Sequence, residues 1–226
     1  METIKTNIVS LSGTITKAPT LSHEILNGEK FYEFMLDIQR LSGAIDTIPV
    51  TISERLIQSS KLSFNVGENL LINGEFRSHN QEDNGKSHLI LSVLCKEVAP
   101  SSGLDENRIE LSGFVCKPPI YRETPFKRQI NDILLAVNRP FNKKSDYIPL
   151  IVWGRNALMA KNMRVGDQIT ISGRIQSRKF TKMDGDIALE KTAYEVSVQE
   201  ILNYEENPSS HVSYDEQAKS ETFERA

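Results

Sequence analysis

Aromatic and basic residues are interleaved between residues 139 and 182, and together they could hold a nucleic-acid strand. The aromatic members are Phe141, Tyr147, Trp153 and Phe180, and Trp153 is the single tryptophan of the chain. Exposed aromatic rings stack on bases of any sequence, for about 1–3 kcal/mol per base. The basic members, which would contact phosphates, are Arg139, Lys143, Lys144, Arg155, Arg174, Arg178, Lys179 and Lys182. Rings combined with cations are typical of single-strand binding.

Two of these rings belong to one short stretch, DYIPLIVW at 146–153. Side chains alternate between the two faces of an extended strand. The apolar set that predicts a core face is Ile148, Leu150 and Val152. The opposite, outward face then carries Tyr147, Pro149, Ile151 and Trp153.

The chain repeats itself at a spacing of 99 or 100 residues. LSGTITKAP at 11–19 returns as LSGFVCKPP at 111–119, and VGENLLINGEFRS at 66–78 returns as VGDQITISGRIQS at 165–177. DTIPVTIS at 46–53 is the first copy of DYIPLIVW. Such self-similarity in constant order indicates two copies of one domain. We therefore predict a first domain at 1–99, a linker at 100–107, a second domain at 108–203 and an acidic, disordered tail at 204–226.

Each copy predicts strands with one helix. In the second copy, alternation predicts strands near 108–117, 130–139, 146–153, 168–180 and 192–201, with a helix in GRNALMAKNMRVG at 154–166. Five strands with a helix between the third and the fourth match the OB-fold, a small Greek-key barrel. The first copy gives the same order, so the predicted class is all-β with two tandem OB-fold barrels. Gly74 and Gly173 share one repeat position inside a strand, which indicates a bulge or barrel corner.

The two copies differ on the outward face of the third strand. There the first copy has Thr47, Pro49, Thr51 and Ser53, so a barrel of this kind folds without aromatic residues at these positions. OB-folds bind ligands on the face of strands two and three and its bordering loops. Tyr147 and Trp153 would lie on that face, with Phe141 and Phe180 at its borders. In the first copy the matching positions fall near Leu41 and His79, and its acidic Glu82 and Asp83 would repel phosphates.

Two structural explanations of the same rings stay open. Phe141 and Phe180 could cap the ends of the barrel, and Tyr147 with Trp153 could form a subunit interface, since interfaces favour both residue types. The charge distribution favours the nucleic-acid hypothesis. The net charge of −3 hides a middle segment, residues 104–203, with 16 Lys+Arg against 12 Asp+Glu, between two acidic segments.

Other function classes receive no support from the sequence. No apolar run approaches the roughly 20 residues that span a bilayer, and METIKTN lacks the apolar stretch of a signal peptide, so we expect a cytoplasmic protein without membrane contact. Cys95 and Cys116 have no metal-ligand spacing and are expected to be reduced and structural. The four histidines are scattered and no phosphate-binding loop is present, so we expect no enzyme, cofactor or metal site.

The motifs LLAVNRPF, DYIPLIVWG, VGDQITISGRIQSRKF and IELSGFV resemble those of bacterial single-stranded DNA-binding proteins. The resemblance covers about 108–201, while the first copy keeps the skeleton LSGTI, DTIPV and VGENLLINGEF. It implies an OB-fold that coats single-stranded DNA in replication, recombination and repair, with Phe141, Tyr147, Trp153 and Phe180 stacking on bases. It also implies a homodimer that presents four OB-folds, partners among replication or repair proteins, and a place with the bacterial nucleoid.

Two departures from that family keep other hypotheses open. The tail ends SYDEQAKSETFERA, a poor copy of the family's acidic tip with its Pro-Phe pair, and the first barrel is poor in aromatic residues. The second hypothesis is therefore a primosome-like or regulatory OB-fold module that docks another protein and binds nucleic acid weakly. The sequence also leaves open whether RNA is bound.

Overall fold

The computed structural model describes residues 6–208 except for 84–85, 102, 141–143 and 185–186, and gives the backbone alone at 83, 86–87, 182–184 and 187. Strands dominate it, which confirms the predicted all-β class. The elements of the first copy are β1 (Asn7–Glu24), β2 (Lys30–Gln39), β3 (Ile45–Ser53), α1 (Glu54–Ser60), β4 (Asn69–Asp83) and β5 (Lys86–Pro100). Those of the second are β6 (Glu106–Val115), β7 (Ile120–Glu123), β8 (Gln129–Asn138), β9 (Ser145–Trp153), α2 (Gly154–Ala160), β10 (Gln168–Asp184) and β11 (Ile187–Glu205).

Each copy closes into a barrel. In the first, β1 pairs with both β2 and β4, and the circuit is completed by β2–β3, the parallel pair β3–β5, and β5–β4. In the second, β6 pairs with β10 and β8, and β9 runs parallel to β11. The predicted tandem OB-fold with a helix after each third strand is confirmed. One strand was not predicted: β7, four residues long, extends the second barrel beyond β8.

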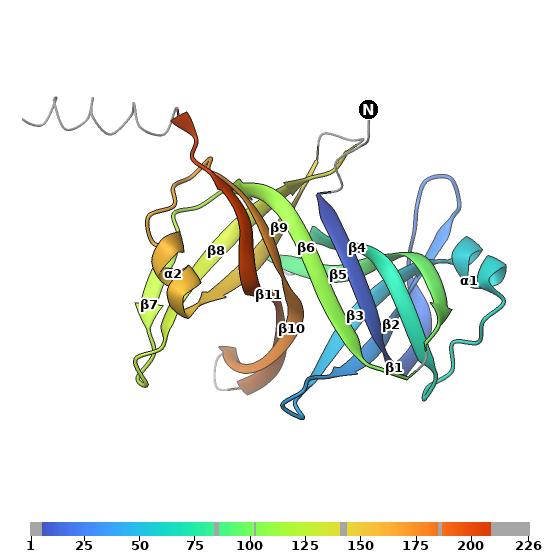
Figure 1. Ribbon diagram of the computed structural model, residues 1–226. Coiled ribbons are helices and arrows are strands. Elements are labelled where there is room, and N and C mark those ends of the chain that lie inside the picture. Colours follow the sequence, from blue (N-terminus) through green and yellow to red (C-terminus); the bar gives the residue numbers. More distant parts are fainter. Residues whose placement is uncertain (1–5, 84–85, 102, 141–143, 185–186, 209–226) are drawn as a thin grey trace, which may run out of the picture.

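The two barrels are joined edge to edge by their first strands. β1 and β6 run antiparallel, with Asn7 opposite Leu111, Val9 opposite Ile109 and Leu11 opposite Asn107. Because these are equivalent positions of the repeat, the pairing has an approximate twofold axis at Val9 and Ile109. Figure 1 shows β1 and β6 side by side between the barrels, with α1 and α2 at opposite ends of the molecule.

Two asparagines hold the ends of this seam. The side chain of Asn7 donates to the carbonyl oxygen of Phe76 and accepts from the Phe76 amide, both at 2.8 Å. Its repeat partner Asn107 makes the same pair of bonds with Ile175, at 2.7 and 2.9 Å. A side-chain amide thus satisfies buried backbone groups where the β1–β4 and β6–β10 ladders end.

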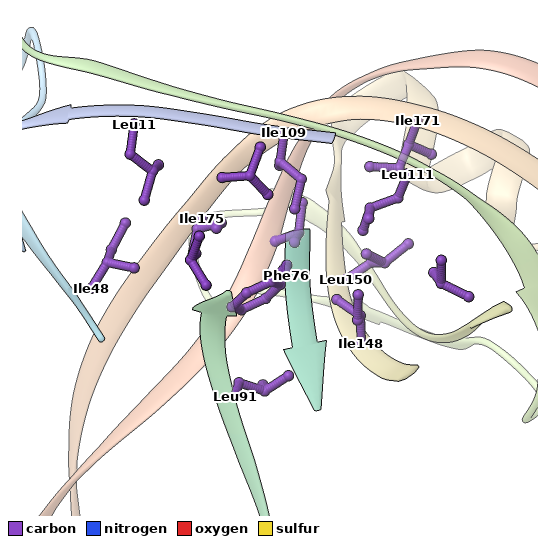
Figure 2. Close-up of a cluster of buried hydrophobic side chains, with 14 of the residues drawn as sticks. Leu11, Ile48, Phe76, Leu91, Ile109, Leu111, Ile148, Leu150, Ile171 and Ile175 are labelled. Atoms are coloured by element: carbon purple, nitrogen blue, oxygen red, sulfur yellow. The ribbon is translucent and has the colours of Figure 1, made fainter. Parts of the chain in front are cut away.

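The core is continuous through both barrels. Side chains from equivalent strands, among them Leu11 and Ile48 of the first barrel and Leu111 and Ile148 of the second, belong to one buried cluster (Figure 2). The predicted inward sets are confirmed, since each is essentially inaccessible to solvent: Ile48, Val50 and Ile52 in β3, and Ile148, Leu150 and Val152 in β9. Burial of branched apolar residues on one face of each strand is what fixes the register.

The strands reach further than the sequence indicated. β11 continues to Glu205, and the Tyr204 hydroxyl donates to the buried Asp167 at 3.0 Å, so residues just past 203 pack on the second barrel. In the segment that joins the barrels, Asp105 accepts a hydrogen bond from the Gln39 amide at 2.5 Å. The remainder of the predicted tail, residues 209–226, lies outside the described residues.

Both cysteines are free thiols, as predicted. Burial raises the pKa of Cys95 to about 12, which keeps this thiol protonated and unreactive at neutral pH. Burial also raises the pKa of the half-buried Cys116. No helix in the described part of the chain is long and apolar enough to cross a membrane.

Gly74 and Gly173 sit at β-bulges, which confirms the corner inferred from their shared repeat position. The strand register shifts between Asn73 and Gly74 and between Ser172 and Gly173. A Cβ at either glycine would run into a backbone carbonyl oxygen of the facing strand, that of Leu94 or of Ser197. The facing backbone approaches so closely that no larger residue fits.

We expect Gly173→Ala to lower the free energy of unfolding by about 1–3 kcal/mol, because the added methyl group forces β10 and β11 apart. The neighbouring change Ser172→Ala, at a half-buried position, should cost less than about 0.5 kcal/mol. Urea denaturation followed by circular dichroism measures both. Equal stabilities of the two variants would contradict the bulge.

Candidate nucleic-acid interface

A groove runs along the outer face of the second barrel. Its volume is about 650 Å³, and its lining comes from β8, β9, β10 and β11 and from the segment that contains β7. The residues that line it include Lys117, Ile120, Arg122, Pro149, Ile151, Trp153, Arg178 and Glu195. This is the face of strands two and three on which OB-folds take up oligonucleotides.

Trp153 lines this groove and keeps 39% of its surface exposed. It is the last residue of β9 and directly precedes α2. At the equivalent place in the first barrel the Ser53 hydroxyl accepts a hydrogen bond from the Leu56 amide at 3.2 Å and caps α1. An indole has no acceptor, and α2 has no side-chain cap. The second barrel therefore lacks a helix-capping hydrogen bond, which typically contributes about 1 kcal/mol. It has an exposed indole ring at that position instead.

Tyr147 is also exposed, at 46%, but it is not among the residues that line the groove. It lies at the start of β9, where its amide donates to the Ser78 hydroxyl of the first barrel at 2.7 Å. The structure thus places Tyr147 and Trp153 at opposite ends of one strand. Neither ring is sealed inside the chain, so both are accessible to a ligand or a partner.

Ile151 lies on the outward face of β9, as predicted, but it is buried. Its side chain is 7% exposed, because β8 and β11 flank it on both sides at the floor of the groove. The repeat partner Thr51 is buried as well, and its hydroxyl donates to Ser92 at 3.0 Å. Strand parity gave the correct face, but neighbouring strands cover its centre.

Phe180 lies in a separate hollow between the two barrels. This hollow, of about 470 Å³, is lined by Pro149, Phe180 and Tyr194 of the second barrel and by Gln81 and His88 of the first, among others. The guanidinium carbon of Arg178 lies 5.7 Å from the centre of the Phe180 ring, within cation–π range. A ring and a cation are therefore adjacent at the edge of the second barrel.

Arg139, a predicted phosphate ligand, is held by a buried carboxylate. It donates to Asp146 at 2.5 and 3.0 Å, and Arg77 of the first barrel donates to the same carboxylate at 2.8 Å. The Ser78 amide is a further donor, at 2.7 Å. Burial would raise the pKa of Asp146, but the bonds from Arg139, Ser78 and Arg77 outweigh it and hold that pKa below its ordinary value.

Arg174, a second predicted phosphate ligand, lies in the matching cluster across the seam. The buried carboxylate of Asp46 accepts from Arg40 at 2.5 Å, from the Ser177 amide at 2.9 Å and from Arg174 at 3.4 Å. Burial and the nearby Arg40 lower the pKa of Arg174. Asp46 and Asp146 are repeat partners, so each aspartate binds the facing barrel. Arg139 also donates to the carbonyl oxygen of Ser78 in the first barrel at 2.9 Å, so both arginines make bonds across the seam.

The remaining cations are placed more openly. Arg178 lies 3.6 Å from Glu195, and Lys179 lies 2.8 Å from Glu190, with both cationic side chains more than half exposed. Arg155 and Lys144 are exposed. Phe141 and Lys143 fall outside the described residues, as does the side chain of Lys182. Of the predicted set, the structure brings Trp153 and Arg178 together in the groove, with Phe180 beside Arg178.

Sequence reasoning missed two cations of the groove wall, Lys117 and Arg122. Arg122 belongs to β7 and donates to Asp132 of β8 at 2.7 Å. Four residues, IYRE, are too short a stretch for alternation to predict a strand, so the signal was weak. Among the described residues, no group of three or more His, Cys, Asp or Glu side chains could hold a metal ion.

The geometry defines an oligonucleotide-binding-fold protein: two fused barrels, one of which carries a groove with an exposed indole and several cations. The model of the Single-strand binding protein family matches residues 106–204, which is the second barrel. A crystal structure of the single-stranded DNA-binding protein from Thermus aquaticus superposes with a TM-score of 0.70 at 19% identity. It covers 89% of this chain and 94% of that one, which shows a common fold for both barrels.

Relatives found by sequence similarity belong to the same family. "Single-stranded DNA-binding protein 2" of Listeria innocua is 33% identical over 113 residues, which are 46% of this chain and 71% of the relative. The single-stranded DNA-binding protein of Oceanobacillus iheyensis is 36% identical over 98 residues, 41% of this chain and 58% of the relative. The chain belongs to the single-strand binding protein family. It spans somewhat more than half the length of the first relatives that it matches.

We expect Arg139→Ala to lower the free energy of unfolding by about 2–3 kcal/mol, because the buried Asp146 loses a partner that donates two hydrogen bonds to it. Lys179→Ala, which removes an ion pair with Glu190 in which both side chains are exposed, should leave the stability almost unchanged. Guanidinium denaturation at neutral pH measures both variants. If Arg139→Ala is no more destabilising than Lys179→Ala, Arg139 does not hold the seam.

Proposed function

We propose that this protein binds single-stranded DNA without sequence preference, mainly through the groove of the second barrel. The observation that carries the proposal is the exposed indole of Trp153 in a groove that also holds Arg178 and Arg122. A base stacks on the indole for about 1–3 kcal/mol, whatever its identity. Catalysis has no part in this proposal.

The cations of the groove are suited to exchange partners. Arg122 pairs with Asp132 where both side chains are partly exposed, and such a pair contributes at most about 1 kcal/mol. A phosphate can therefore replace a carboxylate at little cost, and counterions leave the DNA as it binds. Lys144, Arg155, Lys179 and Lys182, with Lys143, extend the proposed phosphate contacts beyond the groove. Phe141, Tyr147 and Phe180 are the proposed further stacking residues.

The cellular role follows from this binding. We propose that the protein coats single strands in DNA replication, recombination or repair, as a homodimer of four barrels in the bacterial cytoplasm at the nucleoid, alongside replication or repair proteins. The antiparallel seam supports the assembly in part, since one chain already joins two barrels about an approximate twofold axis. RNA is a second proposed ligand, because stacking does not depend on the sugar.

The second candidate is a primosome-like or regulatory module whose first barrel docks another protein. The contrast between Ser53 and Trp153 favours it for the first barrel, where no aromatic ring stands at the capping position. Titration with oligo-dT separates the two candidates, because a docking module would show weak affinity and little quenching of Trp153.

We expect Tyr147→Ala combined with Trp153→Ala to weaken oligo-dT binding at least about tenfold, through the loss of two stacking rings. Fluorescence anisotropy of a labelled oligonucleotide measures the affinity. Phe114→Ala is the matched control, because Phe114 is 39% exposed like Trp153 but does not line the groove. Unchanged affinity of the double variant, with folding intact, would reject this binding face.

The salt dependence tests the cations. Each phosphate contact on a single strand adds about 0.7 to the slope of log affinity against log salt concentration. Arg178→Ala with Lys179→Ala should therefore reduce that slope by about 1.4. An unaltered slope would show that neither cation contacts a phosphate.

A further inference from the structure

A buried carboxylate lies in the groove of the second barrel. Glu195 of β11 is among the residues that line this groove, yet only 7% of its surface is exposed. Glutamate is rarely buried to this extent unless it is paired, and its charge repels the phosphates of a nucleic-acid strand. An anion is therefore unexpected at this place in a groove that is proposed to bind DNA.

The partners of Glu195 occupy one of its two oxygens. The side-chain amide of Gln176 on β10 donates to Oε1 at 2.6 Å, and Nε of Arg178 lies 3.6 Å from the same oxygen. Within the described residues, no hydrogen bond reaches Oε2, and this oxygen is not among the buried polar atoms that lack a partner. Oε2 is therefore open to the groove. An ionised carboxylate has about four acceptor positions, so Glu195 has capacity for a further donor.

Cations on both flanks of β11 offset the charge of Glu195. Arg178 lies on β10, to one side, and Arg122 on β7, beyond β9 and β8 on the other side. The hydrogen bond from Arg122 to Asp132 raises the pKa of Arg122, and the charge of Glu195 raises it further. A buried carboxylate is tolerated at the floor of the groove because such partners compensate it.

The barrel does not require an acid at this position. The parallel pairs β3–β5 and β9–β11 align Val93 with Val196. The repeat partner of Glu195 is therefore Ser92. This serine is buried as well, and its hydroxyl accepts a hydrogen bond from Thr51. A neutral hydroxyl thus completes the first barrel where the second has a carboxylate.

A carboxylate in a binding groove selects for hydrogen-bond donors. Phosphates carry the same charge, so the neutral base is the part of a nucleotide that can approach Glu195. Cytosine presents an N4 amino group and adenine an N6 amino group, and acidic side chains accept from cytosine N4. Thymine has the acceptor O4 in place of that amino group, and two acceptors repel each other.

We propose that Glu195 accepts a hydrogen bond from the amino group of one bound base, and thereby favours bases with an amino group over thymine at that position. The inference rests on the proposed function, because it concerns the same strand in the same groove. The bases that stack elsewhere remain unselected, since stacking tolerates any sequence. The result is a bias in base composition and not the recognition of a defined sequence.

The variant Glu195→Gln tests the proposal, because it keeps the shape of the side chain, removes the charge and replaces one acceptor by a donor. The affinities of the full-length protein for oligo-dC and oligo-dT of about 8 nucleotides, a length that fits one OB-fold, are measured by fluorescence anisotropy. We expect the ratio of the dC affinity to the dT affinity to fall about tenfold in the variant, because cytosine loses a hydrogen bond to a charged group. The ratio cancels any effect of charge that both oligonucleotides share.

The matched control is Glu190→Gln, which removes the same charge from an exposed position of β11, where the carboxylate pairs with Lys179. This variant should leave the ratio unchanged. Circular dichroism confirms that both variants are folded.

A second measurement uses the unaltered protein and so does not depend on the folding of a variant. Its ligand is an oligo-dC in which hydrogen replaces the amino group of every cytosine. We expect this oligonucleotide to bind about tenfold more weakly than oligo-dC, because the donor to Glu195 is missing.

The outcomes are distinct. A lower ratio in Glu195→Gln but not in Glu190→Gln, together with weaker binding of the amino-free oligonucleotide, supports the inference. Equal ratios in the unaltered protein and both variants, or equal binding with and without the amino group, overturns the inference and leaves the proposed function standing. Glu195 would then act only as a partner of Gln176 and Arg178. Absence of binding of any oligonucleotide to the unaltered protein overturns the proposed function itself, and the inference with it.

Discussion

The antiparallel pairing of β1 with β6 is the constraint on which the rest of the structure depends. It fuses two barrels into one sheet about an approximate twofold axis at Val9 and Ile109. Asn7 and Asn107 satisfy the backbone at its ends. Since both barrels share this seam, the direction of every other strand in one barrel relative to the other follows from it. The hollow beside Phe180 exists because the seam brings the long hairpins of the two barrels together.

Two buried aspartates make the seam specific. Asp46 and Asp146 each bind arginines and a serine amide, and in each case the serine belongs to the facing barrel. A buried carboxylate without partners would be costly, so a mispaired arrangement of the barrels is strongly disfavoured. The same chemistry pairs Arg139 with the buried Asp146 and Arg174 with the buried Asp46. Arg178, in contrast, keeps more than half of its side chain exposed.

The two copies of the repeat are alike in their cores and differ on their outer surfaces. Both copies have a glycine at the bulge, Gly74 or Gly173, and an apolar inward set on β3 or β9. Closure of the barrel requires both features. The capping position has become a serine in one copy and a tryptophan in the other, which exchanges a helix cap for an exposed ring. The first copy presents the stacked rings of His23 on β1 and Phe31 on β2, and the second presents Trp153 on β9, so the two barrels are similar scaffolds with different outer surfaces.

The sequence by itself determined the repeat, the two barrels and the outward face of Trp153, because these depend on alternation and spacing within about 100 residues of chain. It did not determine that Arg139 would meet Asp146 and Arg77, or that Ile151 would be covered by β8 and β11. It also gave no sign that His23 would stack on Phe31. Those outcomes depend on which strands become neighbours and in what register. Tertiary structure alone decides that, because a side chain's partner is set by distances in space and not by separation along the chain.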